Sequence, residues 1–262
     1  MTTPKNVIPQ SFILSDSFPN EEGIRSYFNT INQNSFFTSL EEKNTGKEKT
    51  SPLEKTIEVA GNALNFLNSQ TVKNNKEYID QIKKLEEDVL LDHSVVTVLC
   101  AGVSNDFVNK LQSYQLCYSI TRKDFDTELQ FWLTPAYMSS KEVAMFYLEL
   151  YTKFANLKDS LKPKYGITDP RDIKRVMPSG YGTNAILTSG TRKWQEILVK
   201  GTAFKEDHEV RFVLTNLAKN FKNRYQTLFS TMVLENKEGK RFGFDTLKSS
   251  DDAWVNYKIT FG

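Results

Sequence analysis

The sequence predicts an α+β fold in which a mixed sheet carries packed helices. Residues 94–101 and 128–134 are short β-branched or alternating runs, which are typical of strands. The segment that begins near Glu206 instead repeats apolar residues every three or four positions, as an amphipathic helix does. With 262 residues, of which 39% are hydrophobic, the chain is long enough to bury a sizeable core.

Composition excludes several classes of protein. A formal net charge of +2 gives no general attraction to nucleic acid or to an anionic membrane. No apolar run reaches membrane-spanning length, and the N-terminal residues lack the apolar core of a signal peptide. Cys100 and Cys117 fall in apolar segments, so we expect buried thiols in a reducing compartment and a cytoplasmic protein. Two histidines and no Cys-x-x-Cys pair argue against a metal site.

The first half of the chain predicts an arm, two helices and a strand. Residues 1–50 are predicted to start as an extended arm, to form a short helix near 21–27 and to end in the charged loop EEKNTGKEKT. A helix begins at Ser51, where an N-cap precedes a proline, and its apolar side includes Leu53 and Ile57. A second helix covers roughly 75–89 and turns Ile82 inward. The strand over 94–101 follows directly after His93.

The middle and the end of the chain add further elements. Ser104 caps a helix that runs past Leu111, and Ser139 or Ser140 opens a longer helix that reaches Phe154. Residues 241–246 and 253–261 are predicted to pair as a hairpin. We therefore divide the chain into an N-terminal arm and loop (1–50), a core (51–232) and a C-terminal β-hairpin extension (233–262).

The stretch from Asp169 to Tyr225 has three predicted pieces. A short basic helix begins at Pro170 and ends before Pro178. A loop of glycine, serine and threonine follows and ends at 188–192. A long helix then starts near Glu206, with acids in its first turn that complement the helix dipole. The N–H groups and hydroxyls of the loop, together with Arg192, suit an anion, but a surface loop whose arginine caps a neighbouring group fits the same residues.

The order of these pieces resembles the C-terminal half of the flavin-dependent thymidylate synthases. The resemblance extends from about Leu90 to Tyr225, because a strand after His93, an aromatic strand that ends at Pro135 and a Tyr-Leu-Glu-Leu helix at 147–150 also follow the order of the family. The residues that carry it are Pro170, Arg171, Asp172, Ile173, Arg175, Pro178, Thr188, Arg192, Trp194, Leu198, Glu209, Val210, Ala218 and Phe221.

The resemblance implies a flavoprotein of nucleotide biosynthesis that methylates dUMP. In the family FAD relays hydride from NADPH, methylenetetrahydrofolate supplies the carbon, and a homotetramer builds each site from several subunits. By the resemblance His93, Gln112, Ser113, Tyr114 and Arg192 are expected to bind the cofactor. Arg122, Arg175 and Arg192 are expected to bind the substrate, and no catalytic residue is assigned.

The sequence also departs from the family. The Arg-His-Arg of the family signature falls on Gln112-Ser113-Tyr114, the asparagine two residues before Arg192 falls on Gly190, and a pyrimidine-contacting arginine falls on Gly201. Because a hydrogen bond to a charged group contributes roughly 1.5–3 kcal/mol, the loss of two arginines removes about 3–6 kcal/mol of flavin binding.

Three functions remain open from the sequence. The first is a divergent flavin-dependent one-carbon transferase that acts on a pyrimidine nucleotide, by dUMP methylation or a related base modification. The second is a catalytically inactive member of the family that serves as a structural or nucleotide-binding subunit. The third is nucleic-acid binding by the basic helix with Arg171, Lys174 and Arg175, against which the near-neutral charge argues. For two single residues the sequence also allows a structural role in place of ligand binding. His93 can be a structural histidine, and Arg175 can form an ion pair with Asp172.

Overall fold

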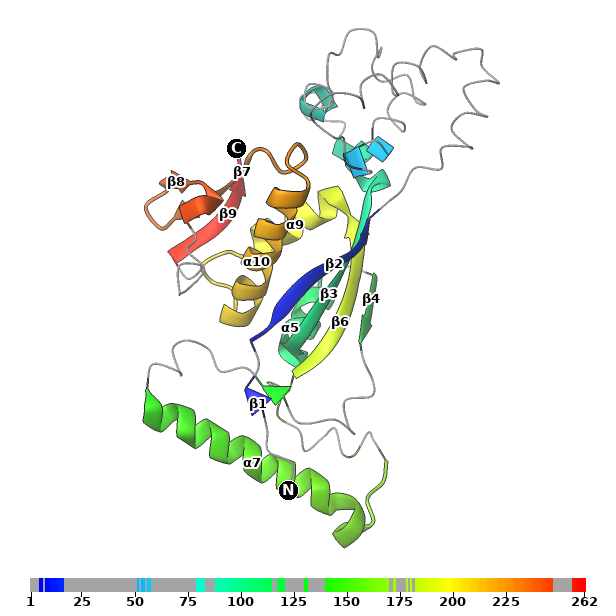
Figure 1. Ribbon diagram of the computed structural model, residues 1–262, viewed down its shortest axis with the longest axis vertical. Coiled ribbons are helices and arrows are strands. Elements are labelled where there is room, and N and C mark those ends of the chain that lie inside the picture. Colours follow the sequence, from blue (N-terminus) through cyan, green and yellow to red (C-terminus); the bar gives the residue numbers. More distant parts are fainter. Residues whose placement is uncertain are drawn as a thin grey trace, which may run out of the picture.

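A computed structural model of the chain shows a four-stranded sheet, helices packed on one of its faces, and a smaller three-stranded sheet beyond those helices (Figure 1). It describes residues 5–6, 8–16, 51, 53–54, 56–57, 79–82, 88–114, 117–120, 130–131, 140–169, 172, 178, 180, 182–246 and 256–262. Within these residues no helix is long and apolar enough to cross a membrane.

The main sheet is antiparallel throughout. Its strands lie in the order β2 (Gln10–Asp16), β3 (Val95–Ser104), β6 (Gly182–Gly190) and β4 (Cys117–Ile120). Parallel pairing occurs, among the described strands, between β1 (Lys5–Asn6) and β5 (Gln130–Phe131), which form a separate pair. The predicted α+β class is confirmed, but the main sheet is not mixed. Strand β2 comes from the predicted N-terminal arm and borders β3.

Strand β6 corrects the prediction of a small-residue loop that ends at 188–192. Its residues alternate between buried and exposed, with Ala185 and Leu187 inward and Ile186 outward, which is the period-two pattern of a strand. Since β6 pairs with β3 on one side and β4 on the other, its backbone groups are used in the sheet. The hydroxyls of Thr97 and Thr188 lie 3.0 Å apart across the pair. Tertiary pairing therefore outweighs the local preference of small polar residues for loops.

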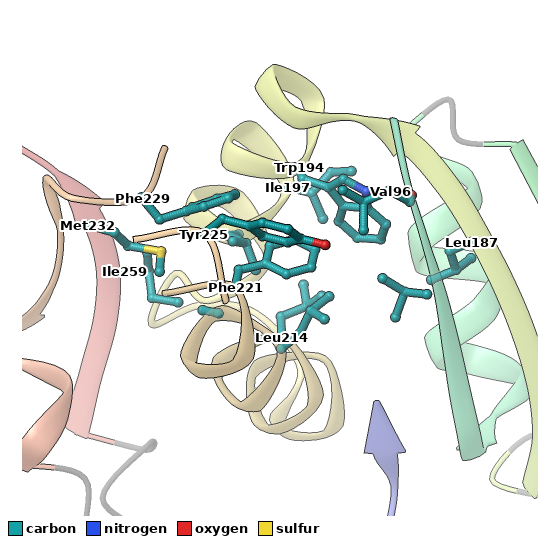
Figure 2. Close-up of a cluster of buried hydrophobic side chains, with 14 of the residues drawn as sticks. Val96, Leu187, Trp194, Ile197, Leu214, Phe221, Tyr225, Phe229, Met232 and Ile259 are labelled. Carbon is teal, nitrogen blue, oxygen red and sulfur yellow. Dashed lines mark hydrogen bonds between the residues drawn. The ribbon is translucent and has the colours of Figure 1, made fainter. Parts of the chain in front are cut away.

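Helices α5 (Asn105–Gln112), α9 (Thr191–Gly201) and α10 (His208–Arg224) pack into one core against the sheet. The predicted start of α5 is confirmed, because Ser104 Oγ accepts the Phe107 N–H at 3.0 Å. The long helix is also confirmed, with Asp207 as its N-cap. Figure 2 shows the aromatic centre of this core, where Trp194, Phe221, Tyr225 and Phe229 lie between the two sheets.

The C-terminal strands form a three-stranded sheet in which β8 (Arg241–Phe242) and β9 (Tyr257–Phe261) flank β7 (Met232–Asn236). The predicted hairpin between 241–246 and 253–261 is therefore wrong, because both segments pair with β7. The actual hairpin joins β7 to β8 through a turn in which Asn236 Oδ1 accepts two backbone N–H groups and Gly239 has a φ of 78°. Residues 244–246 form the 3-10 helix η4 (Phe244–Thr246).

Other described elements include a helical start at Ser51, helical residues at 79–82, a short 3-10 helix η2 (Asp88–His93) and the long helix α7 (Lys141–Tyr165). At Ser51 the hydroxyl accepts the Glu54 N–H while Glu54 accepts the Ser51 N–H, which is the predicted N-terminal cap. Ser140 caps α7, as predicted. The boundaries of the three predicted parts, 1–50, 51–232 and 233–262, stay a prediction.

Candidate functional site

The N-terminus of α9 is held in place by hydrogen bonds to the start of β3. Ser94 donates its hydroxyl to Thr191 Oγ1 at 2.6 Å, and the Thr191 N–H donates to the Ser94 carbonyl at 2.9 Å. Both residues are fully buried. Three residues further along α9, Trp194 donates its indole N–H to the Val96 carbonyl at 3.1 Å on the core side of the helix. These contacts fix the first turn of α9 and with it the position of Arg192.

Arg192 lies at the rim of the molecule and is bound by a carboxylate of the same chain. Its Nε donates to Asp92 Oδ2 at 2.8 Å, and its Nη2 contacts the same oxygen. The two side chains are 45% and 35% exposed, so solvent still reaches the pair. A helix N-terminus and a guanidinium both favour an anion. Here Asp92, from η2, supplies that negative charge.

Glycines stand at the two positions where the resembled family has an asparagine and a pyrimidine-contacting arginine, and neighbouring atoms crowd both positions. A Cβ at Gly190 would lie 3.0 Å from Asp92 Oδ1 and 3.1 Å from Asp92 Cα, so a larger residue there requires η2 to move. A Cβ at Gly201 would lie 2.2 Å from Cδ1 of the fully buried Leu214. Neither position can take the family side chain without repacking of its surroundings.

The predicted cofactor residues of α5 lie at the other end of α9. Ser113 is exposed and donates its hydroxyl to the Lys110 carbonyl, Gln112 is partly exposed, and Tyr114 is buried in the main core. Burial, followed by the charge of Glu206, raises the pKa of Tyr114. Glu206, which follows the C-terminal end of α9, bonds Lys110 Nζ at 2.8 Å.

The predicted cofactor residues therefore form two groups. His93 is exposed and next to Asp92, so it lies near Arg192 at the first turn of α9. Gln112, Ser113 and Tyr114 lie near the last turn, and an eleven-residue helix spans roughly 16 Å. A single chain does not bring the two groups together. Arg122 and Arg175 lie outside the described residues, as do Arg171 and Lys174, so their predicted roles stay predictions.

Glu209 is a buried carboxyl at the junction of α5 and α10. The sequence predicts for it only a favourable interaction with the dipole of the long helix. Glu209 accepts the Ser104 N–H at 2.6 Å and also the Ser104 hydroxyl. Burial raises the pKa of Glu209 to about 7, although the two bonds from Ser104 act in the opposite direction. Nearby, burial and then the charge of Glu209 raise the pKa of Cys100 to about 12, so this thiol is unreactive. The signal that could have indicated such a carboxyl is an acid placed among the apolar residues of α10.

Comparison with known proteins supports the fold. Two crystal structures of thymidylate synthase X (ThyX) from Helicobacter pylori, both with FAD and dUMP, match this chain with a TM-score of 0.53 and 18% sequence identity. The matches cover 68% of this chain and 93% or 94% of those chains. No protein-family model matches the sequence, and no curated protein matches it. The likeness shows a ThyX-like fold, which agrees with the predicted architecture.

Proposed function

We propose that this protein is a divergent flavin-dependent enzyme that transfers a one-carbon unit to a pyrimidine nucleotide, or modifies its base in a related way. The observation that carries the proposal is a ThyX-like fold in which Arg192 is retained, half exposed, at the N-terminus of α9. FAD is the proposed cofactor and a nucleotide such as dUMP the proposed substrate. NADPH and methylenetetrahydrofolate follow from the family resemblance alone.

The hydrogen-bond donors at the N-terminus of α9 fit one phosphate group of a nucleotide. Arg192 offers a guanidinium at the positive end of a helix, where charge-assisted hydrogen bonds to an anion are favourable. The guanidinium already donates to Asp92, so a phosphate has to share this donor or displace the carboxylate. This competition lowers the free energy gained when the phosphate binds. Bound flavin would supply the redox chemistry of the proposed reaction, and Arg192 would hold a phosphate of the flavin or of the substrate nucleotide.

The distance between the two groups of predicted residues supports an oligomeric site. Arg192 and His93 lie at the first turn of α9, whereas Gln112 and Ser113 lie near its last turn. If all of them line one flavin pocket, then different copies of the chain contribute them. A homotetramer with shared sites, as the family resemblance implies, satisfies this requirement.

The second candidate is a catalytically inactive subunit with a structural or nucleotide-binding role. Gly190 and Gly201 favour it, because Asp92 and Leu214 occupy the space next to these positions. In this case the fold persists and the emptied site binds no flavin.

The absorbance spectrum of the purified protein distinguishes the two candidates. An enzyme of the proposed kind is yellow or becomes so with added FAD, releases flavin on denaturation, and unfolds at a higher temperature when FAD is present. A colourless protein whose melting temperature FAD leaves unchanged would overturn the first candidate in favour of the second. Addition of dUMP to the FAD-loaded protein then tests the nucleotide through a further rise in melting temperature.

A further inference from the structure

Helix α7 carries two apolar stripes, and the first packs on the protein. Tyr151 stacks on Phe131 of β5 with ring centroids 4.1 Å apart, and Ala144, Tyr147 and Leu148 pack on the same pair. These contacts hold α7 at the edge of the molecule beside β1 and β5 (Figure 1). They account for one side of the helix.

The second stripe is formed by Val143, Phe146, Leu150, Phe154 and Leu157. The spacing of three or four residues puts all five side chains on one face of an α-helix. Phe146 is 62% exposed, Leu157 38% and Val143 36%, while Leu150 and Phe154 are partly exposed. A contiguous apolar surface of this kind on a soluble fold marks an interaction site.

We propose that this second stripe packs against the same stripe of another copy of the chain, with the two α7 helices antiparallel. A twofold axis at Leu150 places Leu150 against its own copy. Phe146 then meets Phe154 of the second copy, and Val143 meets Leu157 of the second copy. The stripe is thus complementary to itself, as a twofold interface requires. The proposal does not depend on flavin binding.

The charges beside the stripe select the antiparallel orientation. Glu149 and Lys153 both flank its exposed side and both point away from the inner stripe. In the antiparallel pair Glu149 of each copy lies beside Lys153 of the other, so two ion pairs bracket Leu150. In a parallel pair the flanks that carry Glu149 and Lys153 lie on opposite sides of the interface, so these ion pairs do not form. Glu142 and Glu149 on this flank would be repelled by an anionic lipid surface, which argues against lipid as the partner of the stripe.

Sedimentation velocity of the full chain over a range of concentrations tests the interface. The wild type is expected to associate, and Phe146→Glu and Leu157→Glu are expected to raise the dissociation constant by about tenfold or more. Met145→Glu is the matched control, because Met145 is an apolar residue of α7 that is 49% exposed on the far side of the helix. It is expected to associate as the wild type does. Circular dichroism confirms that each variant is folded.

Cross-linking with a short bismaleimide tests the orientation. Leu150→Cys is expected to cross-link to its own copy, whereas Val143→Cys alone is not. A mixture of Val143→Cys and Leu157→Cys chains is expected to give the mixed cross-link, with the wild type as the control for the native cysteines. A monomeric wild type, association that Phe146→Glu leaves unchanged, or a Val143→Cys self-cross-link would overturn the proposal. Monomers that bind anionic vesicles through the stripe would overturn it too and assign the surface to lipid.

Discussion

The core-facing side of helix α9 and its two ends differ in how far they keep the residues of the resembled family. On the core side Trp194, Ile197 and Leu198 are fully buried, and the family-like residues Trp194 and Leu198 are kept. At the ends the family asparagine and arginine are replaced by Gly190 and Gly201. Packing constrains a side chain through many neighbours at once, whereas a ligand contact can be lost without loss of the fold. Similarity of fold can therefore outlast similarity of site.

The largest effect is expected on the core side. Phe221→Ala removes a fully buried ring that contacts Trp194, Tyr225 and Phe229, as Figure 2 shows. Such truncations cost about 3–5 kcal/mol of the free energy of unfolding. Urea unfolding followed by circular dichroism measures the loss. A cost below about 1 kcal/mol would mean that this cluster is not the region that holds the fold.

Gly201→Arg restores the family residue at one end of α9. We expect it to lower the free energy of unfolding by about 3 kcal/mol or more, because it overpacks Leu214 and buries a charge. Lys200→Arg, one residue earlier and exposed, is the control and is expected to change stability by less than about 0.5 kcal/mol. If Gly201→Arg is as stable as this control in the same urea experiment, the position is open to a ligand-binding side chain.

The pH dependence of stability tests the buried carboxyl of Glu209. Its pKa is about 7 in the folded protein, against an ordinary value of 4.5, so the folded state binds more protons than the unfolded state between these pH values. The free energy of unfolding therefore falls as pH rises from about 5 to 7, by about 1–3 kcal/mol in total, and levels off above. Glu209→Gln is expected to lack this fall. Equal pH profiles of the two proteins in urea unfolding would show that Glu209 is charged throughout.

The smallest change in stability is expected at the N-terminal end of α9. Asp92→Asn removes the charge of a half-exposed ion pair, which costs less than about 1 kcal/mol. The same variant removes the negative charge of Asp92 next to Arg192, so inorganic phosphate should raise its melting temperature more than that of the wild type. A loss of several kcal/mol would instead place Asp92 and Arg192 among the residues that hold the fold together.

Local signals in the sequence were sufficient for much of the fold. The sequence predicts helix caps at Ser104 and at Ser139 or Ser140, because a hydroxyl precedes an amphipathic run in each case, and the caps are Ser104 and Ser140. The apolar face of α10 was predicted from its spacing. Strand β6 was missed because Thr188, Ser189 and Gly190 resemble a loop locally, and only the neighbouring strands β3 and β4 hold them extended. The sequence prediction contains no strand at β7 and pairs β8 with β9, whereas β7 lies between them in the structure.

The candidate site was harder to predict, because its contacts join distant parts of the chain. Asp92 and Arg192 are 100 residues apart, and no local pattern indicates that they pair. The separation of Gln112 from Arg192 by the length of α9 likewise depends on how α5 packs beside α9 and α10. The closed surroundings of Gly201 depend on Leu214 of another helix. The sequence thus indicates which side chains are chemically suited to a site, whereas only the structure shows which residues lie next to them.

Titration of FAD, followed by quenching of flavin fluorescence, tests most directly whether Arg192 still binds a nucleotide on this fold. Arg192→Ala is compared with Lys193→Ala, a cation in the same turn of α9 that pairs with Glu196 at 2.8 Å. We predict that the wild type binds FAD and that Arg192→Ala raises the dissociation constant about tenfold or more, since a charge-assisted hydrogen bond is lost. Lys193→Ala is predicted to bind as the wild type does. A wild type that leaves flavin fluorescence unchanged, or an Arg192→Ala protein that binds FAD equally well, would contradict the account.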